Sequence, residues 1–298
     1  MSDERLTVPQ MKELVFASTK DYRLFGEFCD ACRKYRYIGL CHGIPGAGKT
    51  RSAREYASWD ALSSLFPEEL FTLVGRRHLD DQFPHKPFAS PGSPTYTDIL
   101  PCRTVYYTAP VAATASRIER EVMSLSASLS YIVEAAEHAS RGKDDILMAY
   151  RLPKRTELVI VDEADRLKMA GLEQLRDLYD RGNFGLVLIG QPGLEKRLAR
   201  YPQLYSRVGF VHQFHVLSQD ETRWLLEQRW NHLGMHIHVD DFTDQEALAA
   251  IVRITGGNFR VIHRLLMQVE RILEINDLRT VTKDVVETAR ENLVLGQA

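Results

Sequence analysis

The feature that most constrains this fold is a glycine-rich loop between an apolar run and a helical pattern. Residues 43–50 read Gly-Ile-Pro-Gly-Ala-Gly-Lys-Thr and match the pattern G-x-x-x-x-G-K-[ST] at every specified position. The apolar run at 37–41 predicts a strand before the loop, and residues 50–62 predict a helix after it. This is the structural context in which the motif cradles phosphates.

The residues of the loop suit a nucleoside triphosphate. Glycines allow consecutive backbone N–H groups to converge on a phosphate, and the helix that follows adds the partial positive charge of its N-terminus. We expect Lys49 to reach the β- and γ-phosphates and the Thr50 hydroxyl to bind Mg²⁺. The residues predicted to bind ATP are Gly43, Pro45, Gly46, Ala47, Gly48, Lys49, Thr50 and Arg51.

A second apolar run, at 158–161, predicts a buried strand that ends in two carboxylates. Asp162 is expected to hold Mg²⁺, directly or through water, and Glu163 to orient and deprotonate the attacking water. The alternative for Glu163 is a solvated loop carboxylate. Residues 162–165 read Asp-Glu-Ala-Asp, as in the DEAD-box helicases, but the chain has no room for the paired domains of those enzymes.

Short apolar runs alternate with helical patterns along most of the chain. Further strands are predicted at 104–108, 185–189 and 210–216, and helices from Ser18 or Thr19 onwards, at 111–141 and at 172–179. Strands that alternate with helices need crossover connections, which predicts an α/β fold with a parallel sheet flanked by helices. Ligands of such sheets bind at the carboxyl ends of the strands.

Beyond residue 217 the pattern changes to helices alone. Capping-box spacings precede two helical runs, at Ser218 with Glu221 and at Thr243 with Glu246, and Gly256-Gly257 separates the second run from a helix at 259–272.

We therefore divide the chain into an N-terminal arm at 1–20, an α/β core at 21–216 and an all-helical lid at 217–298. Residues 66–103 carry six prolines, which predicts a surface insertion rather than a core element.

Composition limits the partners and the compartment. Lys and Arg number 38 against 40 Asp and Glu, so any DNA contact must come from a local patch. The chain has no signal pattern, no apolar run near the about 18–20 residues of a membrane span and no disulfide framework, and we expect a cytoplasmic protein. Cys29, Cys32, Cys41 and His42 could suggest a zinc site, but the cysteines lie in a predicted helix and a predicted strand, so we expect buried thiols instead.

With these motifs the sequence resembles the AAA+ ATPases, and more narrowly the transposition regulators TnsC, TniB and MuB, with ExeA-type ATPases as close relatives. The resemblance extends over roughly 21–290, and its most specific segments are 39–43, 105–110, 184–194 and 255–260. It implies the AAA+ P-loop fold with a C-terminal helical lid.

The resemblance also implies roles for three further residues. Gln191 is similar in position to sensor 1, which reads the γ-phosphate, and Arg260 to sensor 2, which couples the lid to the nucleotide. Arg207 resembles an arginine finger that completes the site of a neighbouring subunit, with Arg197 and Arg200 as competitors. The alternative for Gln191 is a turn residue without a phosphate contact, and the alternative for the arginines is a surface position. A finger acting in trans requires a ring or a helical filament.

Relatives in this family bind duplex DNA, mostly through its backbone, inside ATP-dependent filaments. The basic candidates here are Arg117, Arg120, Arg141, Lys143, Arg151, Lys154 and Arg155, of which Arg117 and Lys143 are preferred. Solvated surface charge is the alternative for each of them. The aromatic residues Tyr106, Tyr107, Trp224 and Trp230 lie on strand or helix patterns, so we expect them in the core rather than stacked on bases.

The resemblance thus implies an ATP-dependent regulator of DNA transposition that assembles on double-stranded DNA. Its implied partners are a transposase and a TniQ-like target-selection protein, and hydrolysis would disassemble it. One alternative is an ExeA-like scaffold or signalling ATPase that acts through protein contacts without DNA. Another is a P-loop kinase, against which the helical lid and Arg260 after Gly-Gly-Asn argue.

Overall fold

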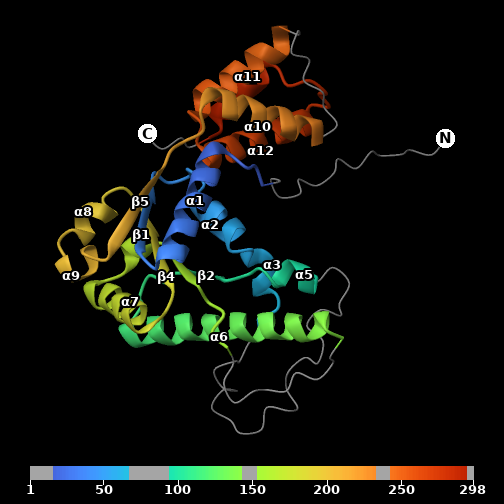
Figure 1. Cartoon of the computed structure of the whole chain (residues 1–298). Helices are drawn as coiled ribbons and strands as arrows, with labels where there is room; N and C mark the ends of the chain where they lie inside the picture. Colours follow the sequence, from blue (N-terminus) through green and yellow to red (C-terminus); the bar gives the residue numbers. More distant parts are fainter. Residues whose placement is uncertain (1–15, 67–93, 143–152, 233–241, 294–298) are drawn as a thin grey trace. The chain divides into compact units, whose positions relative to one another are not determined.

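The computed structural model describes residues 16–66, 94–142, 153–232 and 242–293 (Figure 1). The described residues form two compact units. The larger unit contains Leu24–Gly43 and Lys49–Phe214, and the smaller one contains the described parts of Met1–Arg23 and His215–Ala298 together with Ile44–Gly48.

The larger unit is built on a five-stranded sheet (Figure 1). Its strands are β1 (Ile38–Gly43), β2 (Thr104–Thr108), β3 (Leu158–Asp162), β4 (Gly185–Gly190) and β5 (Val208–Phe214), in the order β2-β3-β4-β1-β5. Every neighbouring pair is parallel. The predicted α/β fold with a parallel sheet is therefore confirmed. The last strand begins and ends two residues earlier than predicted.

Helices cover both faces of this sheet. Alternate residues such as Leu40 and Val161 share a core cluster with Ile118 of α6 (Ala115–Ser140) and Leu172 of α7 (Met169–Arg181). The other face packs against α1 (Lys20–Tyr35), so tightly that a Cβ built on Gly39 would lie 2.5 Å from Cys32 Sγ. Side chains that alternate along a strand necessarily divide between these two faces.

Two local expectations for this unit are wrong. The single helix predicted at 50–62 is two helices, α2 (Lys49–Tyr56) and α3 (Trp59–Ser63), because Ser58 adopts a left-handed backbone with φ of 49°. The predicted insertion at 66–103 lies largely outside the described residues, but its end carries the short helix α5 (Tyr96–Ile99). Ile99 and Cys102 are buried in the core there, so this end is not a surface loop.

Short elements complete the larger unit: the 3-10 turn η1 (Ala164–Arg166) after β3, and the helices α8 (Leu194–Leu198) and α9 (Pro202–Tyr205) between β4 and β5.

The smaller unit is helical in its C-terminal part. It contains α10 (Gln219–His232), α11 (Phe242–Thr255), α12 (Phe259–Ile275) and α13 (Lys283–Glu291), around a core that includes Leu226, Ile251 and Leu265. The first predicted capping box is confirmed, since Ser218 N–H donates to Glu221 Oε2 at 3.0 Å and Glu221 N–H donates to Ser218 Oγ at 3.2 Å.

The second predicted box is not at a helix start, because Thr243 lies within α11. Gly256 and Gly257 have φ of 53° and 76°, which ends α11 as predicted. Among the described helices, none is long and apolar enough to cross a membrane.

Candidate active site

The glycine-rich loop joins the end of β1 to the start of α2. Gly46 and Gly48 have φ of 85° and 96°, a backbone that other residues adopt only with strain. Lys49 Nζ donates to Gly43 O at 2.5 Å. Burial lowers the pKa of Lys49, although nearby carboxylates oppose this shift. A partly buried ammonium gains from an anionic ligand, so the loop and its lysine fit a phosphate group.

Thr50 and Asp162 are brought together from α2 and β3. Thr50 Oγ1 donates to Asp162 Oδ2 at 2.7 Å, and Glu163 N–H donates to Asp162 Oδ1 at 2.8 Å. Asp162 is 2% exposed. Mg²⁺ prefers oxygen ligands and often binds through few carboxylates together with phosphate oxygens. The hydroxyl and the carboxylate therefore fit the magnesium ion that an ATP complex would carry.

Tyr106 of β2 provides a third hydroxyl at this position. Its OH donates to Asp162 Oδ2 at 2.8 Å. Burial and the charge of Asp162 raise the pKa of Tyr106. Tyr106 is in the core as predicted, but its contact with Asp162 is not visible in the sequence pattern.

Glu163 occupies a strained position directly after β3. Its φ of 56° is left-handed. This conformation costs a non-glycine residue on the order of 1–3 kcal/mol, and residues that adopt it are concentrated at functional sites. The side chain is 33% exposed, and Oε1 lies 3.4 Å from Arg166 Nη2. This carboxylate is thus only partly exposed and lies next to the Arg166 cation, which no sequence pattern predicts.

Gln191 follows β4, the strand that lies between β1 and β3. The strand order therefore brings it to the same edge of the sheet as the end of β1 and the two carboxylates. Its backbone N–H donates to Asp165 Oδ1 at 3.2 Å, and its side chain is exposed. Asp165 was missed as a positioning group, because its only sequence signal was the Asp-Glu-Ala-Asp string.

Within the smaller unit, the tip of the loop contacts the start of α12. Asn258 Nδ2 donates to Pro45 O at 2.9 Å, and Phe259 N–H donates to Gly46 O at 3.1 Å. Asn258 Oδ1 also caps α12 by accepting the N–H of Arg260 at 3.0 Å. Arg260 is exposed in the first turn of this helix. An asparagine before a helix predicts the cap, but no sequence signal predicts the bond to Pro45.

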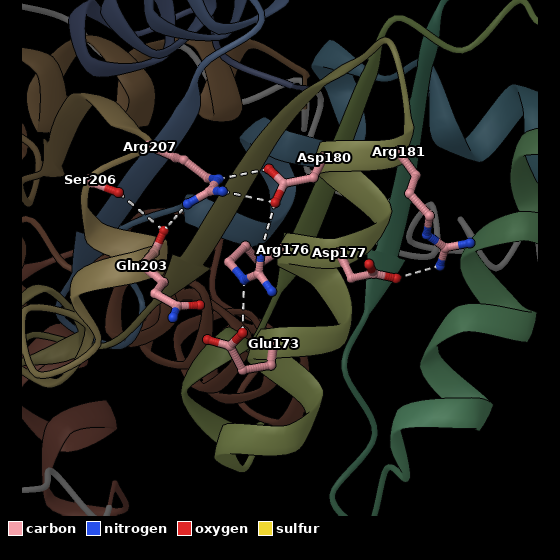
Figure 2. Close-up of polar contacts among 8 residues, drawn as sticks. All are labelled: Glu173, Arg176, Asp177, Asp180, Arg181, Gln203, Ser206 and Arg207. Carbon is pink, nitrogen blue, oxygen red and sulfur yellow. Dashed lines mark hydrogen bonds and ion pairs between the residues drawn. The ribbon is translucent and has the colours of Figure 1, made fainter.

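Arg207 forms a network with α7 in its own subunit (Figure 2). Its Nε and Nη2 donate to Asp180 Oδ1 and Oδ2 at 2.6 and 2.9 Å, and its Nη1 donates to Gln203 O. Asp180 Oδ2 also accepts a hydrogen bond from Arg176 Nη1 at 2.6 Å. The predicted finger is therefore engaged within its subunit by two acceptor groups, one of which is shared with a second arginine.

The two competing arginines differ in their surroundings. Arg197 Nη1 donates to Asp165 O at 2.7 Å, and its Nη2 donates to Leu167 O. These bonds tie α8 to the turn that follows β3. Arg200 is exposed. The backbone contacts of Arg197 give it a structural role that makes it a weaker candidate for a finger.

The model of the AAA domain family matches residues 32–198, which is more than half of the chain. The chain belongs to the AAA domain family.

Individual proteins agree with this assignment. A potential ATP-binding protein of Staphylococcus aureus is 44% identical over 281 residues, which cover 94% of this chain and 97% of that protein. The Mu-like prophage FluMu DNA transposition protein B of Haemophilus influenzae is 31% identical over 125 residues, which cover 39% of this chain and 40% of that protein.

Two solved structures share the fold. The RuvB Holliday junction branch migration motor of Thermotoga maritima has a TM-score of 0.53 at 16% identity, over 92% of this chain and 68% of that one. The ADP form of the Aeropyrum pernix ORC2 protein has a TM-score of 0.52 at 15% identity, over 92% of this chain and 73% of that one.

As an AAA domain protein with an intact phosphate-binding loop, the chain binds ATP and is an ATPase. The predicted AAA+ fold and the predicted enzyme class are thus confirmed, and the described C-terminal region is helical as expected.

Of the seven basic candidates for DNA contact, Arg141 and Lys154 are exposed, and the other five fall into three groups. Arg117 and Arg120 lie on exposed positions of α6, where Arg117 Nε donates to Glu121 Oε1 at 2.7 Å. Arg155 binds Glu134 and Glu137 at 2.9 and 2.8 Å, which gives it a structural role. Lys143 and Arg151 lie outside the described residues.

One aromatic expectation is corrected, since Trp224 is 45% exposed rather than in the core. The three cysteines weighed as a zinc site, Cys29, Cys32 and Cys41, are buried. In the described part of the chain, no group of three or more His, Cys, Asp or Glu side chains is arranged to hold a metal.

Proposed function

We propose that this ATPase regulates DNA transposition. ATP-bound subunits assemble on target duplex DNA, engage a transposase and a TniQ-like target-selection protein, and disassemble after hydrolysis. The observation that carries the proposal is the 31% identity to a DNA transposition protein B, over 125 residues. The resemblance of segments such as 184–194 and 255–260 to the TnsC, TniB and MuB family supports it.

The residues of the site have distinct tasks in this proposal. The loop amides and Lys49 hold the triphosphate, and Thr50 with Asp162 holds Mg²⁺. When bound, Mg²⁺ neutralises charge on the phosphate oxygens. Glu163 accepts the proton of the attacking water.

Two residues relay the state of the nucleotide. Gln191, at the carboxyl edge of the sheet, contacts the γ-phosphate or its water. Arg260 responds to the same phosphate from the first turn of α12, whose cap residue Asn258 already bonds to the loop.

Assembly supplies the last catalytic group. Arg207 acts in trans on the triphosphate of a neighbouring copy, in a head-to-tail contact that can close a ring or extend a filament. To do so it exchanges Asp180 for the phosphate. Both acceptors are anionic groups that bind a guanidinium at two points, so the exchange conserves the type of interaction.

Binding to DNA in this proposal depends on the repetition of a few contacts. A net charge of −2 gives one subunit no overall attraction to DNA, but Arg117 and Arg120, with Lys143, would place basic groups at each subunit of an assembly. Each lost phosphate contact lowers the slope of log binding constant against log salt concentration by about one.

The test is sedimentation and electron microscopy of the protein with linear duplex DNA. We expect oligomers on DNA with a non-hydrolysable ATP analogue and none without nucleotide. Nucleotide-dependent oligomers that form equally well without DNA and do not bind it would instead support the ExeA-like scaffold. Phosphate transfer to an acceptor, with no release to water, would indicate a kinase.

Variants make the test specific to α6. The double change Arg117→Ala and Arg120→Ala should weaken DNA binding at least 10-fold and reduce its salt dependence. The matched control is the double change Arg253→Ala and Arg290→Ala, because both side chains are exposed in the smaller unit, at 64% and 50%, and both pair with Glu287. Equal losses in the two proteins would count against a DNA surface on α6.

A further inference from the structure

Tyr106 directs its hydroxyl at the carboxylate that is proposed to hold Mg²⁺. The OH donates to Asp162 Oδ2 at 2.8 Å, and the same oxygen accepts the Thr50 hydroxyl at 2.7 Å. Tyr106 is 3% exposed, so this bond is shielded from water. In register, Tyr106 pairs with Ile160, two residues before Asp162, which puts the tyrosine and the aspartate on one face of the sheet.

The ring of Tyr106 is fixed by the two helices after the loop. The Trp59 ring of α3 lies 5.6 Å from it between centroids, and the Arg54 guanidinium of α2 lies 5.9 Å from its centroid. Arg54 is itself held by Asp60, with Nε to Oδ1 at 2.8 Å. A ring packed in this way has little freedom to move its hydroxyl away from Asp162.

The direction of the hydrogen bonds is determined by the partners. A tyrosine hydroxyl carries one proton at neutral pH, and a carboxylate can only accept. Thr108 Oγ1 donates to the Tyr106 hydroxyl at 3.2 Å, so Tyr106 accepts from Thr108 and donates to Asp162. The Thr50 hydroxyl likewise donates its proton to Asp162, which leaves the lone pairs of Oγ1 available to a cation.

We propose that Tyr106 is a positioning residue for metal binding. It fixes the rotation of the Asp162 carboxylate, and through that carboxylate the direction of the Thr50 hydroxyl, before the nucleotide arrives. The inference rests on the proposed Mg²⁺ site. Groups that orient a metal ligand without touching the metal typically contribute about 10–100-fold to metal affinity.

The competing explanation is that a buried tyrosine merely needs a hydrogen-bond partner. The next residue offers a matched comparison for it. Tyr107 is also buried, and its OH donates to Glu121 Oε2 of α6 at the same distance of 2.8 Å. Its ring belongs to the core cluster on the opposite face of the sheet, away from Asp162.

The experiment measures ATP binding by calorimetry with Mg²⁺ and with EDTA, for the wild type, Tyr106→Phe and Tyr107→Phe. The ratio of the two affinities is the magnesium gain. We expect Tyr106→Phe to lower this gain about 10-fold or more, with affinity in EDTA unchanged within about 2-fold. Tyr107→Phe should retain the wild-type gain, although both variants lose one hydroxyl–carboxylate bond.

A second measurement distinguishes an effect on Mg²⁺ binding from a general loss of stability in Tyr106→Phe. In an Asp162→Asn background, Tyr106→Phe should have no further effect on the magnesium gain, because its route to the metal is already broken. Equal gains in wild type and Tyr106→Phe, or equal losses in the two tyrosine variants, would overturn the inference. A wild type without any magnesium gain would instead remove the proposed Mg²⁺ site itself.

Discussion

Arg207 and Asp180 form a two-point ion pair inside one subunit, with Nε to Oδ1 at 2.6 Å and Nη2 to Oδ2 at 2.9 Å (Figure 2). The pair is about one-third exposed. Arg176 also donates to Asp180, so the aspartate keeps a cationic partner if Arg207 leaves. This arrangement lowers the cost of releasing Arg207, because no carboxylate is left unpaired.

Arg207→Ala should reduce ATP hydrolysis by about 10³-fold or more while leaving ATP affinity nearly unchanged, because a trans finger acts on transition-state charge. Steady-state hydrolysis and calorimetry measure the two quantities. A mixture with Lys49→Ala should recover part of the activity, since one variant retains the nucleotide site and the other retains the finger. A mixture that stays inactive would favour a role in cis or another arginine, such as Arg200.

Asp180→Ala should lower the protein concentration at which hydrolysis is half-maximal, because Arg207 no longer has to leave an acceptor in its own subunit. The loss of stability should stay within about 1 kcal/mol, as for other partly exposed ion pairs. Hydrolysis rates over a dilution series test the first point, and thermal melting tests the second. Asp177→Ala removes a neighbouring carboxylate that pairs with Arg181 instead, and this control should keep the wild-type concentration dependence.

Glu163→Gln should bind ATP as the wild type does and turn it over about 10²–10⁴-fold more slowly, because the amide cannot take a proton from water. DNA-bound oligomers should then persist after dilution in ATP. Single-turnover assays with radiolabelled ATP measure the chemical step directly. If the variant hydrolyses ATP at the wild-type rate, Glu163 is not the base.

Lys49→Met should stabilise the ligand-free protein at neutral pH. Burial depresses the pKa of Lys49 in the folded state, so its charge costs stability below that pKa. The cost fades as pH rises from the depressed pKa toward the ordinary value of about 10.4, and the advantage of the variant should shrink over this window. Melting curves across alkaline pH test this, where each 1 kcal/mol shifts Tm by about 2–4 °C. Lys196→Met, at an exposed position, controls for the loss of one lysine from the chain.

Strands and loops with strong local signals were predictable from the sequence. The strand at Thr104–Thr108 matches its prediction at both ends, because β-branched and aromatic residues are followed by Ala-Pro, which breaks the pattern. The break at Ser58 was not predictable, since serine does not signal a left-handed backbone as glycine does.

Contacts between distant residues were beyond local patterns. Alternation along β2 predicts a buried Tyr106, but not that its hydroxyl meets a carboxylate 56 positions later. Asp180 carries no local signal of its partner Arg207, which lies 27 positions away in the turn before β5. Such pairings depend on the strand order and on helix docking, which one sequence does not encode in any short window.

The place of β4 in the sheet has a further consequence for Lys49 and Asp162. Asp162 ends β3, and Lys49 follows the loop after β1; these two strands do not pair, because β4 lies between them. With about 4.8 Å between adjacent strands, β4 holds β1 and β3 roughly 10 Å apart. Neither end of β4 has room for a side chain. A Cβ on Gly185 would lie 2.3 Å from Cys32 O, and one on Gly190 would lie 2.7 Å from Asp165 Oδ1. A methyl group at Gly185 would therefore push β4 away from the backbone of α1, and one at Gly190 would displace Asp165, which accepts the backbone N–H of Gln191.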